Sequence, residues 1–280
     1  MEPVHEHEPT LLNPGAEYGN LPFDQFVLTN WNFDKAEEND QEQWNDLASR
    51  WLSMSHVDRS QYWRICSPAD SPPPDAPYLP TQSQIQRILA AHQTITERNV
   101  TQKFLSRVPY PIWIRTCYAV ELDTTYQEMF ECGQTDFGPE IVLDNESLYG
   151  QYGHDWTKVF LRLPQLIDSV VYYNDGHPEN DESRLAISPP NDEARLPLYN
   201  AVMKSKSIYY LFDEEAVQEK LVKVHFLDIH GQSVWYNKIR PEHIQDFEAG
   251  PSGGHLSGHL ENCGDDPSLL HPGTLLYAEE

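Results

Sequence analysis

The sequence lacks the features by which secreted and membrane proteins are usually recognised. No apolar run approaches the roughly 18 residues of a membrane-spanning helix, and the start of the chain has neither the basic nor the apolar part of a signal peptide. The four cysteines lie far apart, form no CxxC pair and predict no disulfide framework. These absences lead us to expect a soluble intracellular protein, cytoplasmic or nuclear, that does not bind membranes.

Basic residues are scarce. The 280 residues include 19 Lys and Arg against 44 Asp and Glu, which gives a formal net charge of −25. Such a surface repels the phosphates of nucleic acids and anionic lipids, so we expect no direct nucleic-acid binding. It attracts basic proteins, cationic ligands and divalent metals. The sequence also leaves open that the charge only keeps the protein soluble.

Motifs of the common enzyme classes are absent as well. The sequence has no Walker loop, no GxGxxG, no GxSxG, no HExxH and no EF-hand pattern. Because many enzymes carry no such motif, their absence does not decide whether this protein is an enzyme.

The clearest local pattern lies at residues 220–247. Residues 221–227 and 233–239 are rich in β-branched and aromatic side chains, and a short turn containing Gly231 separates them, which predicts a β-hairpin. Pro241 ends the second strand because it has no N–H to donate. A hairpin is not stable alone in water, so we expect it to belong to a larger sheet or a small barrel.

Helical patterns dominate the first hundred residues, and strand patterns dominate residues 110–247. Predicted helices are at 37–54, 81–99 and 198–204; predicted strands are at 112–122, 140–143, 157–163, 169–173 and 208–212, and 21–33 is a short strand or irregular segment. The sequence therefore predicts an α+β fold, with N-terminal helices packed on a mostly antiparallel β-sheet, a C-terminal β-hairpin and a disordered acidic tail.

The predicted domain organisation is simple. We expect residues 1–20 to form a flexible acidic arm, residues 21–247 a single α+β domain, and residues 248–280 a disordered tail rich in Gly, Pro and acidic residues. The loop at 67–80 contains six prolines and could divide the domain into two subdomains.

Two groups of residues could hold a divalent metal ion. His225, Asp228 and His230 offer two imidazoles and a carboxylate near a strand end, and the same groups could perform acid–base catalysis if the turn brings them together. A second group at a spacing of four residues could share one helix face, although nearby glycines oppose a helix there. This second group consists of His255, His259 and Cys263.

Two further sets of side chains have alternative interpretations. Trp235 and Tyr236 could form an aromatic patch that binds a peptide or a methylated cation, or they could pack in the core. Asp144, Glu146 and Asp155 lie in a Gly- and Tyr-rich region and could line a cleft.

These patterns favour a non-enzymatic intracellular acidic protein that mediates protein–protein interaction with a basic partner. The alternative is a hydrolase-like enzyme that uses His and carboxylate residues, with or without a metal. A third interpretation is a small-barrel reader of modified peptides. A pocket gathering His225, Asp228 and His230 would favour the enzyme, a flat acidic face would favour the interaction protein, and burial of both Trp235 and Tyr236 would exclude the reader.

Overall fold

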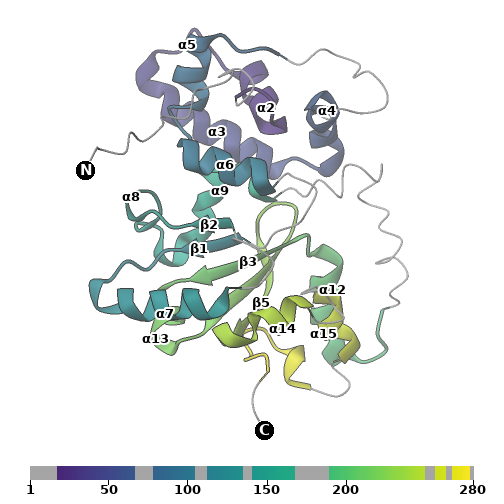
Figure 1. Ribbon diagram of the computed structural model, residues 1–280. Helices are drawn as coiled ribbons and strands as arrows, with labels where there is room; N and C mark the ends of the chain where they lie inside the picture. The colour runs from purple at the N-terminus through teal and green to yellow at the C-terminus, as the bar shows by residue number, and fades with distance from the viewer. Residues whose placement is uncertain are drawn as a thin grey trace, which may run out of the picture.

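A layer of helices lies on a β-sheet in the computed structural model (Figure 1). The described part of the chain contains twelve α-helices and a five-stranded mixed sheet. None of these helices combines the length and the hydropathy that crossing a bilayer requires. The structure describes residues 18–66, 78–104, 112–134, 141–167, 189–249, 256–262 and 267–277.

The sheet has the strand order β2-β1-β3-β4-β5. Its strands are β1 (Ile112–Arg115), β2 (Ile141–Leu143), β3 (Ser207–Phe212), β4 (Val222–Leu227) and β5 (Ser233–Ile239). Strand β1 is parallel to both β2 and β3, whereas β4 is antiparallel to β3 and β5. The sheet is therefore mixed rather than mostly antiparallel. Long connections that contain helices return the chain to begin a parallel strand, and only the short connections on either side of β4 reverse it.

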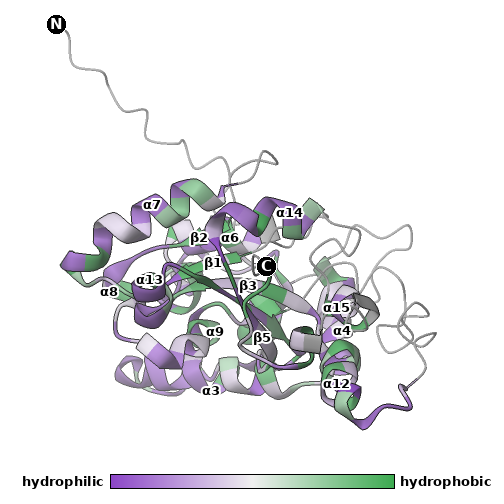
Figure 2. Cartoon of the chain, turned by 90° about the horizontal axis from the view of Figure 1, so that it is seen from below, coloured by the Kyte–Doolittle hydropathy of each residue, from purple (hydrophilic) through white to green (hydrophobic). Residues whose placement is uncertain are grey.

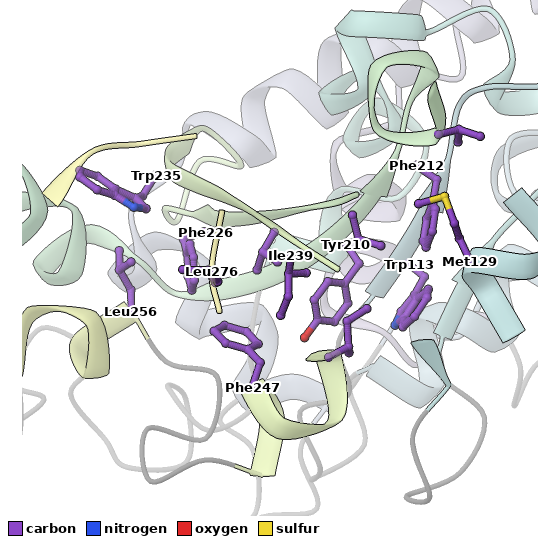
Figure 3. Packing of buried hydrophobic residues seen from close by; sticks show 14 of the residues in the cluster. Trp113, Met129, Tyr210, Phe212, Phe226, Trp235, Ile239, Phe247, Leu256 and Leu276 are labelled. Carbon is purple, nitrogen blue, oxygen red and sulfur yellow. The ribbon is translucent and has the colours of Figure 1, made fainter. Parts of the chain in front are cut away.

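Both faces of the sheet are covered by helices, so its strands are buried on both sides. One face packs against helices from the first part of the chain and the loop after β2: α6 (Ile95–Phe104), α8 (Glu146–Tyr149) and α9 (Val159–Arg162). The other face packs against α7 (Asp123–Gly133), α12 (Leu196–Lys204), α14 (Ile244–Ala249) and α15 (Leu256–Asn262). Figure 3 shows part of the second of these cores, to which Trp113 and Tyr210 from the sheet and Phe247 from α14 contribute.

Residues 21–33 form a helix, contrary to the predicted strand or irregular segment. Helix α2 (Pro22–Asn30) begins with a proline in its first turn, and Asp24 accepts hydrogen bonds from the N–H groups of Gly19 and Leu21. Phe23 and Phe26 then recur at helical spacing and pack against α3 (Asp40–Ser53) and α4 (His56–Cys66). The aromatic content of this segment favours a strand locally, but burial against two helices outweighs that preference.

Two other predicted segments differ in the structure. Residues 157–163 form the end of a 3-10 turn and helix α9 instead of a strand, because Trp156, Val159, Phe160 and Leu163 recur at helical spacing and are all buried. The predicted helix over 81–99 divides into α5 (Gln82–Gln84), a π-helical turn and α6. The predicted strand at 169–173 lies outside the described residues.

Part of the predicted disordered tail is ordered. Leu256 on α15 and Leu276 are buried against the sheet, and Leu269 and Leu270 pack beside them. Apolar side chains spaced among glycines are enough to dock this segment, although its composition resembles that of a disordered chain. Residues 1–17, 250–255 and 263–266 lie outside the described residues.

Buried ion pairs join the helical layer to the rest of the fold. Arg98 on α6 binds Asp24 on α2, with Nη1 2.7 Å from Oδ1, and both side chains are fully buried. The neighbouring Glu97 accepts hydrogen bonds from Arg162 Nε at 2.7 Å and from the Tyr149 hydroxyl at 3.0 Å. Helix α6 is therefore fixed to α2, α8 and α9 at once.

The substitution Arg98→Met should strongly destabilise the protein, because it leaves the carboxylate of Asp24 buried without its guanidinium partner. Removing one partner of a buried ion pair costs about 3–5 kcal/mol. Urea denaturation followed by circular dichroism would measure the loss. The control Lys158→Met removes an exposed pair with Asp155 and should leave the unfolding midpoint nearly unchanged. Equal effects of the two substitutions would contradict the role assigned to Arg98.

Acid should also destabilise the fold through four buried histidines. Burial lowers the pKa of His56, His92, His225 and His259 to about 4. Nearby cations also lower the pKa of His56, whereas at His92 and His225 the neighbouring carboxylates of Asp40 and Asp213 partly oppose the lowering. In the unfolded chain an imidazole titrates near 6.5, so the unfolded state binds more protons in the window between pH 4 and 6.5, and stability falls as the pH decreases through it. We expect a loss on the order of 2 kcal/mol per ring between pH 7.5 and 5.

Urea titrations at a series of pH values would measure this dependence. The variant His92→Gln should show a shallower dependence, because it removes one titrating ring. A free energy of unfolding that stays constant from pH 7.5 to 5 would contradict the prediction.

Candidate functional site

The structure does not bring His225, Asp228 and His230 together into one site. His225 stacks on Tyr236 with ring centroids 5.3 Å apart, and its Nδ1 lies 2.8 Å from Ser233 Oγ. The carboxylate of Asp228 accepts the backbone N–H of His230 at 2.8 Å and so shapes the turn between β4 and β5. Each side chain thus has a structural partner. No group of three His, Cys, Asp or Glu residues that could hold a metal occurs in the described part of the chain.

His230 instead contacts the helical layer. Its Nδ1 lies 2.7 Å from the carbonyl oxygen of Leu52 at the end of α3. The buried Arg59 on α4 donates to the carbonyl oxygens of Leu52 and Ile229 at 3.1 and 2.8 Å. The turn that follows β4 is therefore a contact between the sheet and the N-terminal helices.

The second predicted metal group is only partly described. His255 and Cys263 lie outside the described residues. His259 lies on α15, where its buried ring contacts the rings of Phe226 and Phe247 at centroid distances of 5.8 and 6.0 Å. This histidine packs in the core beneath the sheet.

Trp235 and Tyr236 do not form a common aromatic patch. Because successive side chains of a strand point to opposite faces, Trp235 enters the core while Tyr236 points to the other face. The indole of Trp235 is 5% exposed, and its Nε1 donates to Asn237 Oδ1 at 2.9 Å. The ring of Tyr236 is half-buried against His225.

A different group of charged residues gathers where the three parallel strands end. Arg115 is the last residue of β1, and Asp144 and Asp213 directly follow β2 and β3. Since β1 lies between β2 and β3, the connections that leave this edge run in opposite directions, which is the position where open α/β sheets commonly bind ligands. Helices α7, α8 and α13 (Glu214–Glu219) gather at this end of the sheet in both views (Figure 1 and Figure 2). We call this region the acidic edge and define it as residues 115–134, 144–147 and 213–219.

Arg115 is enclosed at the centre of the acidic edge. Its Nη2 lies 2.6 Å from Asp123 Oδ1, and its Nη1 lies 3.6 Å from Asp144 Oδ2. The guanidinium carbon lies 3.9 Å from the ring centroid of Tyr126 and 4.6 Å from that of Tyr118. Burial and the nearby Asp144 carboxylate raise the pKa of both tyrosines, so they stay protonated. The positive charge is thus held inside the fold by two rings and two carboxylates.

The lysines at this end of the sheet are also paired. Lys223 Nζ lies 2.7 Å from Asp213 Oδ2 and 2.6 Å from Glu215 Oε2. Lys238 Nζ lies 2.8 Å from Glu215 Oε1 and 2.5 Å from Glu219 Oε2. Hydrogen bonds from the two lysines lower the pKa of Glu215 to about 2. Lys223 and Lys238 thus neutralise Asp213, Glu215 and Glu219, which lie close to the sheet. They form no ion pair with the other carboxylates of the acidic edge.

Five carboxylates of the acidic edge face solvent without an ion pair among the described residues. These are Glu121, Glu128, Glu131, Glu146 and Glu214. Val120, which directly precedes Glu121, is 88% exposed. The edge therefore combines uncompensated negative charge with one exposed apolar side chain.

A sequence signal for this edge exists. Residues 116–157 contain nine Asp and Glu and no Lys or Arg, a 42-residue run without a base. Of the three acids predicted to line a cleft, Asp144 lies beside Arg115, Glu146 is exposed and Asp155 pairs with Lys158 at 2.8 Å. The run of acids does not locate Arg115, because one of its carboxylate partners, Asp123, begins α7 while the other, Asp144, follows β2.

Comparisons of the chain with protein-family models, with curated proteins and with solved structures found no match. Functional inference for this chain consequently rests on its own geometry and charge.

Lys223 and Lys238 share Glu215 but should differ in their effect on stability. Lys223→Met leaves Asp213 buried without its cation, and we expect it to cost about 3 kcal/mol. Lys238→Met removes a more exposed pair and should cost much less. Urea denaturation of both variants would test this order. A larger loss for Lys238→Met would show that the buried pair does not stabilise the edge.

Proposed function

We propose that the protein is a non-enzymatic intracellular acidic protein, cytoplasmic or nuclear, and that it binds a basic partner protein through the acidic edge. The proposal rests on one observation: at this end of the sheet three basic residues pair with carboxylates close to the sheet, and five exposed carboxylates have no basic partner among the described residues. The three bases are Arg115, Lys223 and Lys238. Nucleic acid does not fit this surface, because its phosphates would be repelled.

The chemistry of the surface defines the partner. Glu128 and Glu131 lie on the exposed side of α7, and Glu121 precedes that helix by two residues, so a partner needs several Lys or Arg side chains spread over a few turns. Val120 offers one apolar contact that excludes water from the charged pairs around it. Charge complementarity of this kind accelerates association and makes binding sensitive to salt.

Neutralising the acidic edge should weaken this binding. The edge variant carries Glu121→Gln, Glu128→Gln, Glu131→Gln and Glu146→Gln, which removes four charges without a described ion pair. We expect its affinity for the partner to fall about tenfold or more, since each exposed charge pair is worth up to about 1 kcal/mol. Affinity capture from native extract at low and high salt would identify the partner, and titration of that purified partner would measure the affinity.

A matched control separates a local surface from overall charge. The control variant removes four exposed acids from the helical layer, through Asp34→Asn, Glu38→Gln, Glu42→Gln and Asp46→Asn, and so has the same net charge as the edge variant. It should bind like the wild type. Equal weakening in the two variants would overturn the assignment to the acidic edge, and binding that is insensitive to salt would overturn the electrostatic basis.

A further inference from the structure

Strand β5 lies at the edge of the sheet, and a short segment of the chain covers it. An edge strand presents backbone N–H and C=O groups that can pair with another strand. Here the Gly273 N–H donates to the Tyr236 carbonyl at 2.7 Å, the Lys238 N–H donates to the Thr274 carbonyl at 2.9 Å, and the Leu276 N–H donates to the Lys238 carbonyl at 2.8 Å. The pairing is parallel. Residues 273–276, which we call the edge segment, thus extend the sheet.

The first position of the edge segment accepts only glycine. Gly273 has φ +80°, a conformation that other residues rarely adopt. A Cβ atom at this position would lie 2.7 Å from the hydroxyl oxygen of Tyr236 and 3.1 Å from its Cζ. The ring of Tyr236 therefore forms a wall that selects against any side chain.

The second residue of the edge segment, Thr274, forms a hydrogen bond with a buried amide. Asn237 on β5 is 0% exposed, and its Oδ1 accepts the indole N–H of Trp235. Its Nδ2 donates to Thr274 Oγ1 at 3.1 Å and approaches the Thr274 carbonyl at 3.4 Å. A residue that lacks a side-chain acceptor at this position would leave the buried amide of Asn237 with only the longer contact to the backbone carbonyl.

The fourth residue of the edge segment, Leu276, packs in the hydrophobic core. Leu276 is 2% exposed and belongs to the cluster that includes Phe226 and Ile239 (Figure 3). The third residue, Leu275, is only half-buried. The edge of β5 thus selects glycine, threonine and leucine at the first, second and fourth positions, and tolerates other residues at the third.

We propose that the edge of β5 is an exchangeable strand-addition site that recognises an extended Gly-Thr-x-Leu segment, and that residues 273–276 of the same chain are its occupant. Besides its contacts with β5, this segment is held by hydrogen bonds from Thr274 Oγ1 to the carbonyl oxygens of Ser268 and His271 and by the packing of Leu276 in the core. Attachment within one chain gives this arrangement a high effective concentration. This inference does not depend on the acidic edge.

The test uses the full chain with a protease site inserted between residues 262 and 267. The probe is a fluorescent synthetic peptide of residues 267–280, and fluorescence anisotropy measures its binding. We expect the cleaved protein to bind the peptide saturably by exchange. The uncleaved protein should bind it at least a hundredfold more weakly, because its own segment occupies the site.

Peptide variants test the reading of each position. Thr274→Val should weaken binding about tenfold, Gly273→Val should abolish it, and Leu275→Ser should change it less than threefold. The proposal is overturned if the cleaved protein keeps its circular dichroism spectrum and takes up no peptide. It is also overturned if the cleaved protein binds all four peptides equally.

A second measurement applies if cleavage unfolds the protein. In the intact chain, Thr274→Val should loosen the edge segment and accelerate hydrogen exchange of the Lys238 amide about tenfold, whereas Leu275→Ser should not. Unchanged exchange at Lys238 in the Thr274→Val variant would overturn the proposal.

Discussion

Two adjacent charges on α6 determine how the layers of this protein meet. Arg98 binds Asp24 on α2, while Glu97 binds Arg162 on α9 and Tyr149 on α8. Removing charges from water is costly unless each finds a close partner, so this arrangement is stable only with all of these helices in place. Helix α6 in turn contacts β2, and β2 positions the loop that carries Asp144. The charged groups at the far end of the sheet therefore depend on pairs buried in the helical layer.

Several of the chain's few basic residues act inside the fold. Arg59, Arg98, Arg115, Arg162 and Lys223 all satisfy internal carboxylates or carbonyl groups. Each base that is engaged in this way is withdrawn from the surface. These bases do not compensate Glu121, Glu128 and Glu131 on the acidic edge, which face solvent without an ion pair in the described part of the chain.

Short-range periodicity predicts much of the fold, and long-range pairing decides the rest. Alternation predicts strands at 221–227 and 233–239, where the structure has β4 and β5, and helical spacing predicts α3. The same reasoning assigns a strand to 157–163, because its β-branched and aromatic composition conceals a helical spacing. The parallel pairing of β1 with β3 and the contact of Arg115 with Asp144 join residues distant in sequence, so local patterns do not predict either. For that reason the predicted cluster of His225, Asp228 and His230 is not observed as a site, and each of these residues has a structural partner.

Residues 273–276, which pair with β5, are synthesised after all five strands, and this order affects how the chain folds. All five strands leave the ribosome before the segment that covers β5. During that interval a nascent chain can assemble its sheet while one row of backbone groups and the amide of Asn237 still lack their partners. Unpaired strand edges are the surfaces through which incomplete chains associate. A chain that lacks residues 273–276 would therefore carry an exposed strand edge, which chaperones and proteases can recognise.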